Sequence, residues 1–167
     1  YKRQCEDLAL DSDRAELCRR TFTGKNYEVS TMEIDRDTDS YMIFTVNEIL
    51  SKYKDAQLFL IIGSDMFLSF HKWYKYREIM KKCTLCVMSR EDEDTVKALR
   101  SYAFSALHIY MPSNEANGII ISPSSPLEIS STEIRQKISA GEDVSDVLTK
   151  EAYEFIKERG MYGYAKK

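Results

Sequence analysis

A run of hydroxyl side chains followed by an arginine lies near the carboxyl end of the chain: Ile-Ser-Ser-Thr-Glu-Ile-Arg at residues 129–135. Serine followed three residues later by glutamate is the spacing of a capping box, in which Ser130 binds a first-turn amide and Glu133 binds back to the cap. The same helix amino terminus directs free N–H groups and a partial positive charge at an anion. Ser131, Thr132 and Arg135 can then complete a phosphate site. Both interpretations can hold at once, so the run predicts a capped helix and is the leading candidate for phosphate binding.

A glycine and an acidic residue follow the most apolar segment of the chain. Residues 58–62 are Leu-Phe-Leu-Ile-Ile, the run stops at Gly63, and Asp65 comes shortly after it. A continuous apolar run of this kind is typical of a parallel strand that is covered on both faces. At the end of such a strand a missing side chain admits a ligand, and a carboxylate can accept hydrogen bonds from ribose hydroxyls. The alternative is an ordinary strand-to-helix turn with Asp65 at the helix start.

The four cysteines offer little for metal chemistry. Cys83 and Cys86 have the C-x-x-C spacing of zinc and thioredoxin-like sites, but no second such pair or histidine cluster accompanies them. They also open an apolar run typical of a strand, on which residues three apart point to opposite faces and cannot bind one ion together. We therefore expect reduced structural cysteines, as in a cytosolic protein.

The composition indicates one soluble domain. The 167 residues are 43% hydrophobic, which is enough for a core, and no stretch approaches the ~18 to 20 apolar residues of a membrane span. No basic segment followed by an apolar one marks a signal peptide, so we expect a cytoplasmic protein without a membrane partner. The formal net charge of -3 argues against a nucleic-acid partner but leaves room for one nucleotide held by local cations.

Helices and strands alternate along the predicted chain. The stripe Val46, Ile49, Leu50 and Tyr53 has the i, i+3, i+4, i+7 spacing of a helix with one buried face. The same reasoning predicts helices at about residues 12–23, 43–53, 65 onward, 76–82, 91–104, 131–140 and 150–159, with Ser12 capping the first and the one at 91–104 on the surface. It predicts strands at about residues 27–30, 32–34, 58–62, 85–88, 107–110 and 119–121. This order favours an α/β fold, a doubly wound, mostly parallel sheet whose ligands bind outside the carboxyl ends of the strands.

Several segments, in the same order, match those of one enzyme family. Ile-Ser-Ser-Thr-x-Ile-Arg resembles the carboxy-terminal phosphate motif of the nucleotidylyltransferase superfamily, and the other segments resemble its bacterial nicotinate-nucleotide adenylyltransferases. Ser-Tyr-Met-Ile-Phe-Thr-Val at residues 40–46 is similar to the family's Ser-Tyr-Thr-x-x-Thr-Leu, and Ile-Ile-Gly-Ser-Asp at 61–65 to its Ile-Ile-Gly-Ala-Asp. His-Lys-Trp-Tyr at 71–74 is similar to its Pro-x-Trp loop, and residues 155–162 to its Tyr-Ile…Gly-Leu-Tyr ending. The resemblance spans nearly the whole chain and implies a single Rossmann-like nucleotidyltransferase domain over residues 1–167.

The resemblance implies adenylyl transfer from ATP to nicotinate mononucleotide, with Mg²⁺, giving nicotinate adenine dinucleotide and pyrophosphate. No covalent enzyme intermediate is needed, so the expected side chains align the substrates and stabilise phosphate charge. The residues implied to bind ATP are Gly63, Asp65, Ser130, Ser131, Thr132, Arg135 and Lys2. Those implied to bind the pyridine mononucleotide are Met42 near the ring, Trp73 stacked on it, Tyr74 through its backbone and Arg90 at the phosphate. Without the resemblance, Trp73 would be a partly buried anchor under its loop.

The chain departs from the family at several positions. Met42 and His71 stand where the family has threonine and proline, Phe44 replaces its usual aspartate, and Thr149 replaces a proline near the end. These changes leave open another acceptor, such as nicotinamide mononucleotide or phosphopantetheine. The family's catalytic His-x-Gly-His motif has no counterpart, since the histidines of this chain are His71 and His108.

The missing motif leads to an expectation about the polypeptide. We expect a strand, a His-x-Gly-His loop and a helix before Tyr1, because Tyr1 and Lys2 match the end of the family's Pro-Pro-His-Lys loop. A doubly wound sheet without its first, central strand would also leave unpaired edges inside the domain. The alternative is a nucleotide-binding protein without catalysis. A homo-oligomer is compatible with this sequence.

Overall fold

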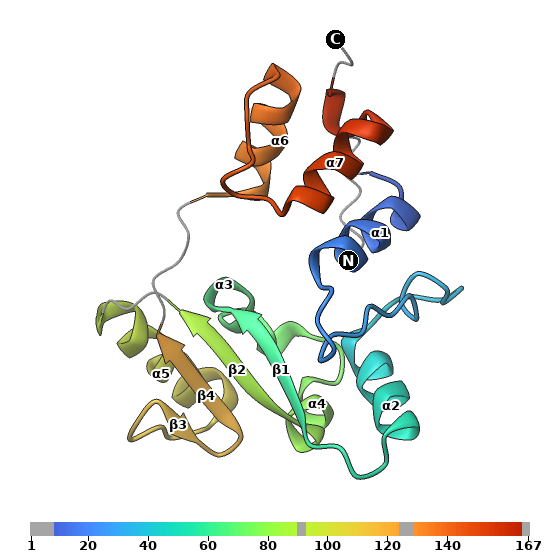
Figure 1. The fold of residues 1–167 in the computed structure, drawn as a ribbon. Coiled ribbons are helices and arrows are strands. Elements are labelled where there is room, and N and C mark those ends of the chain that lie inside the picture. The colour runs from blue at the N-terminus through green and yellow to red at the C-terminus, as the bar shows by residue number, and fades with distance from the viewer. Residues whose placement is uncertain (1–8, 90–92, 124–128, 165–167) are drawn as a thin grey trace. The chain divides into compact units, whose positions relative to one another are not determined.

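A computed structural model describes residues 9–89, 93–123 and 129–164 (Figure 1). Lys2 and Arg90, implied in ATP and mononucleotide binding, lie outside the described residues. The chain divides into two compact units, one formed by residues 1–38 with 128–167 and the other by residues 39–127. Each unit has its own hydrophobic core. The expectation of one nucleotidyltransferase domain stays a prediction.

The unit of residues 39–127 is built on a mixed sheet whose described strands have the order β1-β2-β4-β3. The parallel strands are β1 (Leu58–Gly63), β2 (Cys83–Ser89) and β4 (Ile119–Pro123), and the short β3 (Glu115–Ala116) runs antiparallel to β4. Ile62 pairs with Val87, which pairs with Ile121, so the carboxyl ends of the parallel strands meet at one edge. This arrangement confirms the predicted α/β fold with a mostly parallel sheet.

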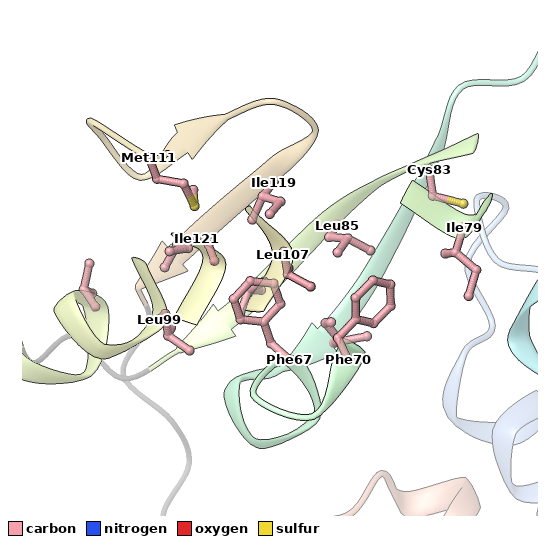
Figure 2. Packing of buried hydrophobic residues seen from close by; sticks show 14 of the residues in the cluster. Phe67, Phe70, Ile79, Cys83, Leu85, Leu99, Leu107, Met111, Ile119 and Ile121 are labelled. Carbon is pink, nitrogen blue, oxygen red and sulfur yellow. The ribbon is translucent and has the colours of Figure 1, made fainter. Parts of the chain in front are cut away.

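The same unit contains the helices α2 (Met42–Lys52), α3 (Ser64–Phe67), α4 (Tyr76–Lys82) and α5 (Glu93–Leu107) and the 3-10 turn η1 (Phe70–Lys72). Side chains from these elements and from the sheet form one core, in which Phe67, Phe70, Ile79 and Leu85 are fully buried (Figure 2). Burying a side chain of this size stabilises a fold by about 1.5–3 kcal/mol. The core therefore holds α3, η1 and α4 against the sheet.

β1 is covered on one face only within the described part of the chain. Ile62 faces the core, whereas Phe59 and Ile61 are 51% and 70% exposed. The prediction that the apolar run 58–62 is covered on both faces is therefore wrong for the described residues. The physical reason is that the core takes its β1 and β2 side chains from the face that carries Ile62, Leu85 and Val87. β1 also lies at the edge of the sheet, and the strand expected beside it stays a prediction.

The helix α5 is longer and more buried than the sequence predicts. Val96, Leu99, Ala103 and Leu107 are buried at helical spacing, so α5 packs into the core and the prediction of a surface helix is wrong. The strand predicted at residues 107–110 is wrong as well, because the helix continues to Leu107. The chain then turns at His108, which has a φ of 61°.

A hairpin that the sequence analysis missed joins β3 to β4. Asn117 and Gly118 lie between the two strands and have φ values of 48° and 77°. Asn-Gly is the strongest two-residue hairpin signal, because the turn needs positive φ at both positions. The signal was present in the sequence, but no strand was predicted at residues 115–116, directly before the turn.

The other unit contains α1 (Asp11–Thr21), α6 (Ser131–Ala140), α7 (Lys150–Arg159) and the 3-10 turn η2 (Met161–Gly163). α1 packs on α7, where Arg159 donates a hydrogen bond to Asp13 at 2.9 Å and the guanidinium of Arg20 lies 4.4 Å from the ring centre of Phe155. Ser12 does not cap α1, which begins at Asp11.

The strands predicted at residues 27–30 and 32–34 are wrong. Thr31 instead forms a turn, in which its carbonyl accepts from the N–H groups of Ile34 and Asp35 at 2.8 and 2.9 Å. Its hydroxyl also donates to the carboxylate of Asp35 at 2.6 Å. A local side-chain bond of this type competes with strand formation.

The ends of the last two helices follow the prediction. Gly141 and Gly160 end α6 and α7 with φ values of 73° and 60°, the left-handed conformation that favours glycine. Thr149, which stands in place of the family's proline, caps α7 by accepting a hydrogen bond from the N–H of Ala152 at 3.3 Å. Among the described residues, no helix is long and apolar enough to span a membrane.

Candidate functional site

Gly63 and Asp65 lie where the parallel strands end. Gly63 is the last residue of β1 and pairs with Met88 of β2, whose partner on β4 is Ser122. A Cβ atom placed on Gly63 would lie 2.7 Å from Oδ1 of Asp65, closer than such contacts occur. The carboxylate of Asp65 therefore lies over the strand end, and glycine leaves room for it. The structure brings these two candidates together at the edge where parallel α/β folds bind ligands.

Trp73 follows η1 and is half-buried. Its ring centre lies 5.1 Å from that of the fully buried Phe70, and its backbone N–H donates to the Phe70 carbonyl at 2.9 Å. The indole packs against the core of its unit. Trp73 is thus an anchor for its loop, as the residue alone predicts, and its exposed part is what a pyridine ring could contact. The stacking role stays a prediction.

Tyr74 belongs to an exposed aromatic group that the sequence analysis missed. Its ring centre lies 4.7 Å from that of Tyr41 and 6.1 Å from that of Phe44, and its side chain is 46% exposed. Met42, next to Tyr41, is the first residue of α2 and packs partly buried against the core. The start of α2 and the loop at Tyr74 therefore meet. The spacing of Tyr41 and Phe44 on one helix turn was visible in the sequence, whereas their contact with Tyr74 was not.

The start of α6 is a capping box, as predicted. Ser130 Oγ accepts from the Glu133 N–H at 3.1 Å, and the Ser130 N–H donates to Glu133 Oε2 at 2.6 Å. Hydrogen bonding to the side chain and then the backbone of Ser130 lowers the pKa of Glu133 below its ordinary value. The box occupies the amides of Ser130 and Glu133. In the described part of the chain the amides of Ser131 and Thr132 then remain as first-turn donors for an anion.

Arg135 extends from the same helix and donates a hydrogen bond to Thr132 Oγ1 at 3.2 Å. Tyr162 of η2 is close enough to Arg135 to feel the charge of its guanidinium group. Burial raises the pKa of Tyr162, and the nearby guanidinium groups of Arg135 and Arg14 act in the opposite direction. Tyr162 has a φ of 56°, a strained conformation for a residue other than glycine. The fold thus adds a strained tyrosine to the neighbourhood of the predicted phosphate-binding arginine.

No group of three or more His, Cys, Asp or Glu side chains that could hold a metal ion occurs among the residues that the structure describes. Cys83 is buried and Cys86 lies three residues further along β2, on the opposite face of the strand. The expectation that this pair binds no metal ion stays a prediction. Burial raises the pKa of the Cys83 thiol.

A mostly parallel sheet with candidate ligand-binding residues outside its carboxyl ends defines an α/β nucleotide-binding fold. The sequence model of the Cytidylyltransferase-like family matches residues 1–137, and the chain belongs to that family. The structure is similar to that of the Plasmodium falciparum nicotinic acid mononucleotide adenylyltransferase complexed with APC, with a TM-score of 0.65 and 13% identity. The match covers 97% of this chain and 80% of the Plasmodium chain, and it shows a shared fold.

Curated relatives are closer in sequence. A probable nicotinate-nucleotide adenylyltransferase of Legionella pneumophila (strain Corby) is 31% identical over 144 residues, which are 82% of this chain and 68% of the relative. A protein with the same description from Shewanella frigidimarina is 31% identical over 143 residues, covering 81% and 68%. A third, from Fusobacterium nucleatum, is 30% identical over 154 residues, covering 91% and 74%.

Proposed function

We propose that this protein is a nicotinate-nucleotide adenylyltransferase, which transfers the adenylyl group of ATP to nicotinate mononucleotide and releases pyrophosphate. The observation that carries the proposal is the 31% identity, over 82% of the chain, to a relative with that description. The juxtaposition of Gly63 and Asp65 at the carboxyl edge of the sheet supports it. We also place the protein in the cytoplasm, and the free thiols of Cys18, Cys83 and Cys86 support that location.

The reaction forms one bond and breaks another at the α-phosphorus of ATP. A phosphate oxygen of the mononucleotide attacks, the bond to the oxygen that bridges to the β-phosphate breaks, and pyrophosphate leaves with the electron pair. No side chain becomes covalently attached. The protein therefore acts by aligning the two substrates and by stabilising phosphate charge.

In this proposal each candidate residue has a separate task. Asp65, whose carboxylate lies in the room that Gly63 leaves, accepts hydrogen bonds from ribose hydroxyls. Arg135 binds phosphate, together with the amides and hydroxyls of Ser131 and Thr132. A charged hydrogen bond is worth about 1.5–3 kcal/mol, roughly twice a neutral one. Asp65 and Arg135, the two charged residues, are therefore expected to contribute more than Ser131 and Thr132.

The acceptor is assigned to the region around Trp73, Tyr74 and Met42. The exposed part of the Trp73 indole offers a flat surface to a pyridine ring, and the aromatic group at Tyr74 lies beside it in the chain. Lys2 and Arg90 are proposed phosphate ligands on the resemblance alone. Mg²⁺ bound to the ATP phosphates would neutralise charge that develops on the leaving pyrophosphate.

Turnover with a panel of acceptors tests the function. The complete polypeptide, with any residues that precede Tyr1, is incubated with ATP, Mg²⁺ and one of nicotinate mononucleotide, nicotinamide mononucleotide or phosphopantetheine. The products are measured by mass spectrometry together with pyrophosphate release. We expect the highest kcat/KM with nicotinate mononucleotide. A clear preference for either other acceptor would overturn the assignment. Binding of ATP without pyrophosphate release would instead favour a non-catalytic nucleotide-binding protein.

A further inference from the structure

Tyr102 of α5 forms hydrogen bonds with His71 in η1, the short turn between α3 and α4. The His71 N–H donates to Tyr102 Oη at 3.0 Å, and His71 Nδ1 lies 2.8 Å from the same oxygen. With the ring proton of His71 on Nε2, the hydroxyl accepts from the backbone N–H and donates to Nδ1. Both capacities of the hydroxyl are then used, which favours one position of the loop.

Packing against the core orients the Tyr102 ring toward His71. This ring lies edge-on to Phe67, with centroids 5.2 Å apart and planes at 71°, and Phe67 is fully buried. Burial raises the pKa of Tyr102, against the effect of the backbone hydrogen bond to His71. The phenol therefore stays protonated and keeps the proton that it donates. Tyr102 and Phe67 come from α5 and α3, so the contact ties the loop to a helix from a distant part of the sequence.

The tied segment leads directly to the candidate acceptor residues. His71 lies in the short 3-10 turn η1, which ends at Lys72, and Trp73 follows directly. Trp73 packs against Phe70 of this turn, and His71 of the same turn contacts Tyr102. A shift of His71 would move the backbone that carries Trp73 and Tyr74. Proline at residue 71, as in the resembled family, has no N–H with which to make this contact.

We propose that Tyr102 is a positioning residue: its hydroxyl fixes the His71 turn and thereby sets the place of Trp73 and Tyr74 for the acceptor. This inference rests on the proposed function in assigning the acceptor to that loop. The inference goes beyond the proposed function because it assigns a role to a helix residue that contacts no substrate.

The test uses Tyr102→Phe, which keeps the ring against Phe67 and removes the hydroxyl. Tyr110→Phe removes the hydroxyl of a tyrosine that is 69% exposed and serves as the matched control. We expect Tyr102→Phe to raise the KM for the mononucleotide about 2- to 12-fold, the range of one net hydrogen bond, with little change in the KM for ATP. His71→Ala in the Tyr102→Phe background should add little, because the hydroxyl that the His71 ring contacts is already absent.

A second readout needs no substrate. Trp73 is the only tryptophan, so acrylamide quenching of its fluorescence reports on the loop in the free protein. Quenching should rise in Tyr102→Phe and not in Tyr110→Phe, with the melting temperature nearly unchanged. Unchanged quenching overturns the proposal, as does an equal rise in both Michaelis constants with a clear loss of melting temperature. If the wild-type protein transfers adenylyl to none of the acceptors, the proposed function fails and quenching alone decides the role of Tyr102.

Discussion

Gly63→Ala isolates the role of the strand end. The backbone at Gly63 has φ -75° and ψ 161°, which alanine adopts without strain. Replacing glycine by alanine at such a position stabilises a protein by about 0.4–1 kcal/mol, because the unfolded chain loses freedom. The added methyl group would, however, lie 2.7 Å from Oδ1 of Asp65. The flexible end of Asp65 must then move, whereas the sheet need not.

The expected loss is therefore in nucleotide binding and not in stability. If Asp65 accepts hydrogen bonds from the ribose, displacing its carboxylate removes an interaction worth about 1.5–3 kcal/mol, or roughly 10- to 150-fold in affinity for ATP. Titration calorimetry with ATP and a thermal melt measure the two effects separately. We expect weaker ATP binding with an equal or slightly higher melting temperature.

A double-mutant cycle tests whether Gly63 acts on ATP binding through Asp65. Asp65→Ala should weaken ATP binding as much as Gly63→Ala does, and the double variant should be no weaker than Asp65→Ala alone. Gly24→Ala, in the other unit, is the control for a general effect of replacing glycine. Additive losses in the double variant, or unchanged ATP affinity in Gly63→Ala, would show that Gly63 does not act through Asp65.

Further substitutions test the remaining residues. Arg135→Ala should weaken ATP binding about 10- to 150-fold with the fold intact, whereas the exposed control Arg77→Ala should not. Unchanged affinity in Arg135→Ala would leave the start of α6 with a capping role only. Trp73→Ala should raise the KM for the mononucleotide about 5- to 150-fold and, because its ring rests on the buried core, lower the melting temperature more than Tyr74→Ala does. Equal losses for ATP and the mononucleotide would leave Trp73 with a structural role only. The pKa of Glu133 is lowered in the folded state, so its stabilising effect is present above the ordinary value of 4.5 and is lost as the pH falls through the folded value. The difference in melting temperature between the wild type and Glu133→Gln should therefore shrink below that pH, and a constant difference would refute the pH linkage.

Features governed by local chemistry were predictable from the sequence. The capping box at Ser130, the glycine ends of α6 and α7 and the parallel strands β1, β2 and β4 all depend on residues within one turn or one apolar run. The position of Gly63 at a strand end was visible for the same reason. Errors arose where a local signal competed with others, as at Thr31, where the side chain forms a turn in a segment that has a strand-like composition.

Only the tertiary structure decided which side chains meet. The open face of β1, with Phe59 and Ile61 exposed, cannot be inferred from an apolar run, because the run is the same whether one face or both are covered. The group of Tyr41, Phe44 and Tyr74 and the contact of Tyr102 with His71 join separate elements. Such contacts depend on how helices pack on the sheet, and packing is set by shape and burial summed over many residues, so it leaves no pattern in any one segment of the chain.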